Sequence, residues 1–161
     1  MQHSYATETE DRYLEFSMGP QVFALPILNV REVISIPETT PLPGAPKYFE
    51  GLMNLRGQII TIIDLKTKMA IPAVDQSSEE AVIVLTLGEY SFGIHVDSIN
   101  RVSNFAKADI SEVPEIETQV KSEFIKGIYQ KKEGLVILLN IEKVLNLKDL
   151  NLIDNQQKRA A

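Results

Sequence analysis

The sequence predicts a mainly β protein built from two related units. Apolar and polar residues alternate in several short runs, turn residues separate these runs in pairs, and the whole pattern occurs twice. Residues 16–33 align without a gap on 85–102, and residues 51–65 align on 127–141, with apolar and turn positions matched. Repetition of this kind is typical of two copies of one structural unit.

The length of the chain limits how these units can be arranged. Each unit has roughly 70 residues, near the lower size at which a domain is stable alone, so we expect the two to share an interface. The first unit is expected at about 13–70, the linker at 71–80 and the second unit at about 81–154. Residues 1–11 and 155–161 are polar and are predicted to be flexible tails.

Each unit contains two predicted β-hairpins. Gly19 and Gly57 mark the turns of the first unit, and Gly88 and Gly134 mark those of the second. Alternating or continuous apolar runs flank each turn, which is the pattern of antiparallel strands joined by a tight connection. Four hairpins predict a fold rich in sheet, with few helices.

Short helices are expected after the second hairpin of each unit. Asp64 and Asn140 stand where a helix N-cap belongs, because their side chains can accept hydrogen bonds from the free amides of a first turn. The helix after Asn140 is predicted over 141 to about 153, with one apolar face packed on a barrel. Residues 47–50 are expected to form one helical turn at most.

Composition argues against several classes of protein. The formal net charge is −6, whereas a nucleic-acid binder needs a basic surface to neutralise phosphates, so no nucleic-acid partner is expected. The chain has no cysteine, which excludes thiolate chemistry and fits a reducing compartment. No apolar run approaches the roughly 20 residues that span a bilayer. We therefore expect a cytoplasmic protein with no direct membrane insertion.

The sequence also lacks a recognisable catalytic or metal-binding pattern. It contains no zinc-protease motif, no nucleophile elbow, no dinucleotide fingerprint and no phosphate loop. His3 lies in a predicted tail, and His95 lies in a predicted strand, where a side chain on the pleated face of a sheet is favoured over a catalytic role. We expect no enzymatic activity, no cofactor and no metal.

Arg56 is the leading candidate for a binding residue. It lies in a tight turn between two apolar strands, which would hold its side chain with little entropy left to lose on binding. Arginine is also frequent at interface hot spots. The alternative is a structural role, in which Arg56 pairs locally with Glu50 or Asp64. Val30 and Val33 could belong to the surface or to the core, and the core is favoured for Val33.

Four segments of the chain carry a resemblance to a known family. They are 27–33, 49–65 with the motif Asn54-Leu55-Arg56-Gly57, 92–97 and 139–145. Together they resemble the signature of the CheW family, the coupling proteins of bacterial chemotaxis, and the similarity covers about residues 12–154. At Thr61 the family commonly has a proline, a departure expected to alter the local strand only slightly.

The resemblance implies a fold of two five-stranded β-barrels of SH3-like type around a common hydrophobic interior. It also implies a non-catalytic adaptor that couples the cytoplasmic tips of chemoreceptors to the regulatory domain of the histidine kinase CheA, recruited to membrane receptor arrays. The receptor-binding residues carried over by position are Val30, Glu32, Gly51, Asn54 and Arg56. Kinase contacts are implied at strand edges and apolar loops, without assignment to residues.

Two alternatives stay open from the sequence. The same domain occurs fused in CheV and CheA proteins, so the chain could be a CheW-like domain cut from a larger protein. An alternative of another class is a β-barrel module that binds a ligand or a nucleic acid. The acidic charge and the lack of evident surface aromatic residues argue against it. Retention on heparin at moderate salt would favour it.

Overall fold

The computed structural model describes residues 11–74, 79–112 and 121–159. His3 and nearly all of the predicted N-terminal tail therefore lie outside the described residues, as do 75–78 of the predicted linker. The strands are β1 (Arg12–Met18), β2 (Gln21–Pro26), β3 (Val30–Ser35), β4 (Phe49–Leu55), β5 (Gln58–Asp64), β6 (Ala81–Leu87), β7 (Tyr90–Val96), β8 (Ser98–Asn104), β9 (Ile110–Ser111), β10 (Ile125–Lys131) and β11 (Gly134–Leu139). The α-helices are α2 (Leu65–Met69), α3 (Ile141–Val144) and α4 (Leu147–Arg159), and the 3₁₀ helices are η1 (Ile27–Asn29), η2 (Lys107–Asp109) and η3 (Ser122–Phe124).

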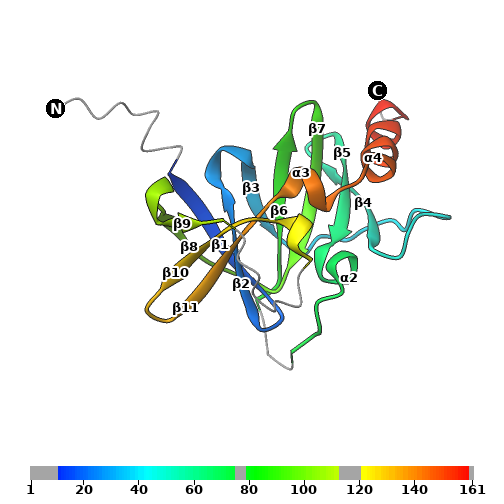
Figure 1. The fold of residues 1–161 in the computed structure, drawn as a ribbon. Helices are drawn as coiled ribbons and strands as arrows, with labels where there is room; N and C mark the ends of the chain where they lie inside the picture. The colour runs from blue at the N-terminus through cyan, green and yellow to red at the C-terminus, as the bar shows by residue number, and fades with distance from the viewer. Residues whose placement is uncertain (1–10, 75–78, 113–120, 160–161) are drawn as a thin grey trace.

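The strands form two sheets that lie side by side, with α4 at the far end of the molecule from β8 and β9 (Figure 1). The strand order is β8-β1-β2-β11-β10-β9 in one sheet and β3-β6-β7-β5-β4 in the other. The expectation of a mainly β fold with two sheets and a C-terminal helix is confirmed. One sheet has six strands in place of five, because the two-residue strand β9 pairs with Ile128 and Tyr129 of β10.

Each sheet takes strands from both halves of the sequence, which differs from the expectation that each repeat builds its own barrel. The first-repeat strand β2 pairs in parallel with β11, and the first-repeat strand β5 pairs in parallel with β7. The first hairpin of each repeat therefore lies beside the second hairpin of the other. Alternation of apolar residues fixes which face of a strand is buried but not which strand it pairs with. The sequence repeat could not reveal this exchange.

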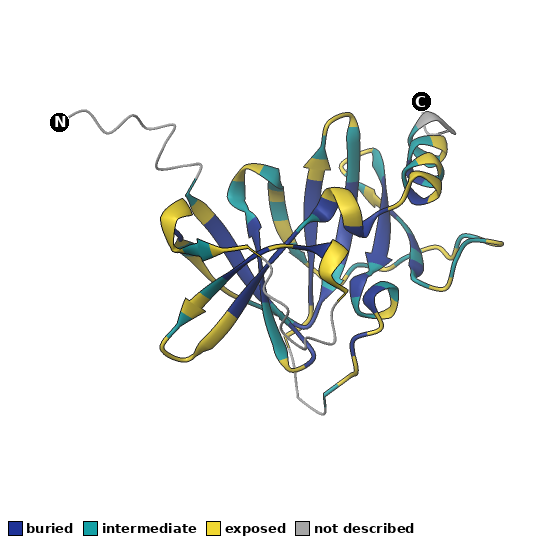
Figure 2. Cartoon of the chain, viewed as in Figure 1, coloured by how far each residue is buried: buried dark blue, intermediate teal, exposed yellow. Residues whose placement is uncertain are grey.

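The largest hydrophobic core draws side chains from both sheets. It includes Phe16, Phe23 and Phe92, all without exposed surface, and the rings of the first two are stacked with centroids 6.0 Å apart. Smaller clusters lie on each sheet, around Val136 in one and Ile60 in the other. Figure 2 shows buried residues concentrated along the central strands. Full burial of each such side chain contributes about 1.5–3 kcal/mol, so the shared core ties the sheets into one unit.

All four predicted hairpins form: Gly19, Gly57 and Gly88 lie in the turns of three, and Gly134 is the first residue of β11 in the fourth, directly after the turn. Gly19 is required for a local reason as well. Its φ angle is +57°, and a Cβ atom there would lie 2.5 Å from the carbonyl oxygen of Pro72. The turn after β1 therefore packs against the start of the predicted linker too closely for any side chain.

The two predicted helix caps behave differently. The Oδ1 atom of Asp64 accepts hydrogen bonds from Lys66 N at 3.1 Å and Thr67 N at 3.4 Å, which confirms it as the N-cap of α2. Asn140 occupies the N-cap position of α3 without a side-chain hydrogen bond. Residues 47–50 are not a helical turn, because Phe49 already begins β4.

The predicted helix over 141–153 is divided into α3 and α4. The division lies at Asn146, whose Oδ1 atom accepts a hydrogen bond from Asp149 N at 2.8 Å, while Asp149 Oδ2 accepts one from Asn146 N at 3.1 Å. This reciprocal pair is a capping box, which starts a new helix. The expected tail at 155–161 is helical as far as Arg159. Among the described residues, no helix has the length and apolar character needed to cross a membrane.

Asp149 also holds α4 against the five-stranded sheet. Its carboxylate is fully buried and accepts hydrogen bonds from the Tyr48 hydroxyl and, at 2.9 Å, from Lys68 Nζ. The Lys68 ammonium lies 4.3 Å from the centroid of the Tyr48 ring. Further along the helix, Gln157 Oε1 accepts a hydrogen bond from Ser91 N at 3.0 Å. The C-terminal helix is therefore fixed to the domain at both ends.

Candidate partner-binding site

The turn between β4 and β5 holds Arg56 in a defined position. Arg56 and Gly57 have φ angles of +50° and +85°, as a two-residue turn of type I′ requires. Asn54 closes the turn, since its Oδ1 atom accepts a hydrogen bond from Gly57 N at 2.8 Å. A positive φ is uncommon for a residue other than glycine, so these contacts stabilise the conformation at Arg56. The guanidinium group is therefore presented by a rigid hairpin.

Arg56 forms a two-point ion pair with Glu32 of β3. Arg56 Nη1 lies 2.8 Å from Glu32 Oε2, and Nη2 lies 3.1 Å from Oε1. Hydrogen bonds from Arg56 lower the pKa of Glu32, and the same bonds raise the pKa of Arg56. The Arg56 side chain is 69% exposed and that of Glu32 is 23% exposed. The partner of Arg56 is therefore Glu32, in place of the local partners Glu50 and Asp64 considered from the sequence.

A second side-chain contact runs parallel to this pair. Arg31 Nη1 donates a hydrogen bond of 2.6 Å to Gln58 Oε1. Because β3 and β4 are the two edges of the five-stranded sheet, both contacts join one edge to the hairpin that carries the other. Side chains therefore connect β3 to the β4–β5 hairpin here. In the described ranges, no backbone hydrogen bonds of a β-ladder connect β3 to this hairpin.

Val30, Val33 and Gly51 differ in exposure and do not form one surface patch. Val30 is partly buried and packs against the shared core, whereas Val33 is 42% exposed. The expectation that Val33 belongs to the core is wrong, because exposure alternates along β3 and Val33 falls on the exposed side of the strand. Gly51 is buried with φ +149°, and a Cβ atom there would lie 2.4 Å from the Thr40 carbonyl oxygen.

The five predicted receptor-binding residues thus divide into two groups. Glu32, Asn54 and Arg56 meet at the bridged edge of the five-stranded sheet, on β3 and on the turn that Asn54 closes. Val30 and Gly51 shape the backbone of the same two strands and offer little surface of their own.

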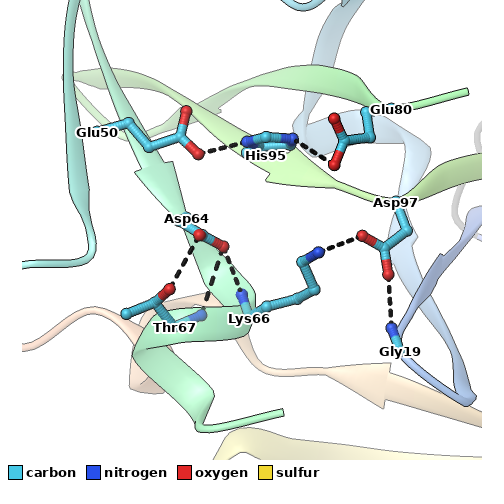
Figure 3. Close-up of polar contacts among 8 residues, drawn as sticks. All are labelled: Gly19, Glu50, Asp64, Lys66, Thr67, Glu80, His95 and Asp97. Carbon is cyan, nitrogen blue, oxygen red and sulfur yellow. Dashed lines mark hydrogen bonds and ion pairs between the residues drawn. The ribbon is translucent and has the colours of Figure 1, made fainter. Parts of the chain in front are cut away.

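His95 of β7 lies between two carboxylates, which Figure 3 shows on either side of its ring. Its Nδ1 atom contacts Glu50 Oε1 of β4, and its Nε2 atom lies 3.5 Å from Glu80 Oε1, just before β6. The hydrogen bond with Glu50 raises the pKa of His95, with smaller contributions from the charges of Glu80 and Asp64. His95 is thus a strand side chain that lies between carboxylates, and the sequence carried no local signal for these partners.

A second polar cluster in Figure 3 joins the sheets below His95. Asp97 Oδ2 accepts a hydrogen bond of 2.7 Å from Gly19 N, and its Oδ1 atom forms an ion pair with Lys66 of α2. The turn after β1, the end of β7 and the short helix α2 are thereby linked through one carboxylate. This cluster supports the fold and presents no reactive group to solvent, since the Asp97 side chain is only 11% exposed.

The groups at the bridged edge are suited to binding. Among the described residues, no three or more histidine, cysteine, aspartate or glutamate side chains converge as metal ligands. The exposed residues at the bridged edge offer a guanidinium, a carboxylate and an amide on rigid backbone, which is suited to recognition of a partner surface.

Comparison with known proteins gives consistent matches to one family. A family model described as CheW-like domain matches residues 12–149. Chemotaxis protein CheW of Klebsiella aerogenes is 33% identical over 146 residues, covering 91% of this chain and 88% of that protein. Chemotaxis protein CheW of Treponema pallidum is 30% identical over 144 residues, covering 87% of this chain and 85% of that protein.

A solved structure extends the comparison to the fold. The crystal structure of scaffolding protein TtCheW from Thermoanaerobacter tengcongensis superposes with a TM-score of 0.80 at 25% identity, covering 92% of this chain and 96% of that one. A family model that spans both sheets, relatives at 30% identity or more, and a shared fold lead to one conclusion. This chain belongs to the CheW family of chemotaxis proteins.

Proposed function

We propose that this protein is a non-catalytic adaptor that couples the cytoplasmic tips of chemoreceptors to the regulatory domain of a CheA-type histidine kinase. Its relatives are named chemotaxis and scaffolding proteins, and they match nearly the whole chain. We infer that the protein works in the cytoplasm and is recruited to receptor arrays at the membrane through its partners.

The bridged edge around Arg56 is the proposed receptor site, and the Arg56–Glu32 pair is the observation that carries it. A hairpin turn fixes one charge and a sheet edge fixes the other, so neither loses much conformational entropy on binding. A receptor helix that offers a carboxylate to Arg56 and a donor to Glu32 would replace contacts that the two groups make with each other. Val30 and Gly51 contribute through the backbone of β3 and β4, which support this site.

Kinase contacts are proposed on the apolar surface around β3. Leu28, Val33 and Ile36 are 64%, 42% and 42% exposed, an unusual density of large apolar side chains near one free strand edge. Exposed apolar residues beside an unpaired edge favour association with another sheet. Such an interface is expected to be small and of weak to moderate affinity, because an array multiplies it.

Reconstitution with both partners tests this function. The protein is mixed with a receptor signalling fragment and the kinase, and autophosphorylation is measured with and without the adaptor. We expect receptor control of the kinase only when all three components are present, together with direct binding of the adaptor to each partner. Absence of any complex with the kinase regulatory domain at high micromolar concentration would contradict the proposal.

A further inference from the structure

The two edges of the six-stranded sheet stay apart over part of their length. Among the residues that the structure describes, strand β8 pairs only with β1, and β9 covers only Ile128 and Tyr129 of β10. A hollow of about 490 Å³ lies between β8 and the end of β10. Its walls include Arg101 and Ser103 of β8 and Lys131 of β10. The elements that line it, β8 and the β10–β11 hairpin, lie at the end of the molecule far from α4 (Figure 1).

The polar side chains on the two walls of the hollow do not bond directly to each other across it. In the five-stranded sheet, Arg56 and Glu32 reach across from one edge to the opposite hairpin. In the described part of the six-stranded sheet, Ser103 and Lys131 both bond inward to Glu15 of β1, Lys131 at 2.7 Å, and do not bond to each other. The side chains of β8 and β10 are therefore joined here only through the Glu15 carboxylate, which lies on β1 below the opening.

The free charge around this hollow is positive. Glu15 is only 3% exposed and neutralises Lys131. The side chains of Arg101 and Lys132 are exposed and have no hydrogen-bond or ion-pair partner among the described residues, and the hollow has one acidic wall residue, Glu133. This local excess of cations lies on a protein with a net charge of −6, so it attracts anionic groups selectively.

Two stacked aromatic rings lie beneath the hollow. The rings of Phe105 and Tyr129 are stacked with centroids 4.1 Å apart, and the Lys131 ammonium lies 5.5 Å from the Phe105 centroid. Phe105 is only 1% exposed, so a ligand here would meet the partly exposed Tyr129 below and cations at the rim, and along one side it would meet the edge of β8 that has no partner strand in the described residues. That combination suits a peptide in extended conformation better than a small free anion, which would use only the rim.

We propose that the hollow between β8 and β10 binds an extended acidic peptide segment of a partner protein. The peptide backbone pairs with the free edge of β8, and its carboxylates contact Arg101 and Lys132. Strand addition to a sheet edge supplies the backbone hydrogen bonds, and the arginine fork supplies recognition of carboxylate. The volume of the hollow is within the range of ligand sites, on the order of 300–1,000 Å³. This surface is separate from the proposed receptor site, which lies on the other sheet.

A charged peptide and its neutral equivalent provide the test. A short fluorescent oligoglutamate peptide and an oligoglutamine peptide of equal length are titrated with the full chain at low salt, and binding is followed by fluorescence anisotropy. Backbone amide NMR shifts locate the contact. We expect saturable binding of the glutamate peptide, weakened by salt, with shifts concentrated in residues 101–105 and 130–132. Equal binding of the neutral peptide, or shifts elsewhere, would overturn the proposal.

Charge reversal at the rim provides the matched variant. The double variant Arg101→Glu, Lys132→Glu is expected to bind the glutamate peptide at least about tenfold more weakly. The control Lys121→Glu, Lys126→Glu has the same change in net charge, with one residue before β10 and one at its opposite end, and should bind as the native protein does. The single variant Arg101→Gln should show an intermediate loss. An equal loss in the control, or complete displacement of the peptide by inorganic phosphate, would contradict a peptide site.

Discussion

Arg56 and Glu32 lie 24 residues apart in the sequence, and their side chains meet in a two-point ion pair at the edge of the five-stranded sheet. In the free protein, the hydrogen-bonding groups of the two side chains are paired with each other. A partner must therefore offer complementary groups to both, or leave one of them without its contact. Exposed pairs of this kind add little to stability, but they discriminate strongly among partners. The pair is thus better suited to specificity than to holding the fold together.

The first prediction separates these two roles by charge reversal. Arg56→Glu should leave the melting temperature within about 3 °C of the native value, since exposed substitutions have small effects on stability. Binding to a receptor fragment should weaken by at least about tenfold, because the variant loses its hydrogen bonds and places like charge beside Glu32. Binding to the kinase regulatory domain should persist. Calorimetry and surface-based binding assays measure the three quantities.

Lys143→Glu is the control for this variant. It reverses an exposed charge on α3, away from the bridged edge, and should change neither stability nor receptor binding. If Arg56→Glu unfolds the protein, or loses both partners equally, Arg56 is a structural residue and the receptor site lies elsewhere.

The second prediction concerns Gly51. Gly51→Ala should lower the free energy of unfolding by about 2 kcal/mol or more, because a Cβ atom would overlap the Thr40 carbonyl oxygen at 2.4 Å. Gly134→Ala is a closely matched control: φ is +143° there against +149° at Gly51, and no atom lies within 4 Å of the added Cβ. Denaturant unfolding should show a clearly smaller loss for Gly134→Ala. Equal losses would mean that backbone conformation alone, without the close approach, requires glycine at 51.

Local features of this fold follow from the sequence. Alternation and glycine turns predict the hairpins at Gly19, Gly57 and Gly88, because a strand of period two and a tight turn depend only on neighbouring residues. Asp64 is a correct N-cap for the same reason. The break between α3 and α4 was missed, although Asn146 and Asp149 have the spacing of a capping box, because the apolar pattern runs through it.

Contacts between distant segments could not be predicted in this way. The exchange of hairpins between repeats, and the choice of Glu32 as the partner of Arg56, depend on which strands pair. Two repeats with similar apolar patterns leave that choice open. The position of His95 between carboxylates from β4 and from the segment before β6 has the same origin. Family resemblance supplied the candidate receptor residues, and the structure supplied their geometry.

The third prediction uses the pH dependence of stability at His95. The contact with Glu50 raises the pKa of His95 in the folded protein above its unfolded value of about 6.5. The resulting stability is complete below the unfolded pKa and is lost as the pH rises through the folded pKa. The difference in unfolding free energy between the native protein and His95→Gln should therefore shrink as the pH rises from about 6 to 9.

Glu50→Gln tests the cause of that dependence. It removes the group that contributes most to the raised pKa, while Glu80 and Asp64 remain beside the ring. The pH dependence attributed to His95 should become clearly weaker in this variant, as measured by denaturant unfolding across the same range. An unchanged dependence in both variants would show that His95 has no part in it.

The last prediction concerns the buried carboxylate that fixes the C-terminal helix. Asp149→Asn removes the charge that compensates Lys68, whose side chain is only 11% exposed, while the size of the side chain is kept. Loss of one member of a fully buried pair costs about 3–5 kcal/mol, and the remaining solvent contact of Lys68 reduces our expectation to about 2 kcal/mol. Hydrogen exchange should show faster opening of α4 than of the central strands. Glu142→Gln makes the same charge change on the exposed face of α3 and should cost no more than about 0.5 kcal/mol. If both variants lose the same small amount, the position of α4 depends on its apolar face and not on Asp149.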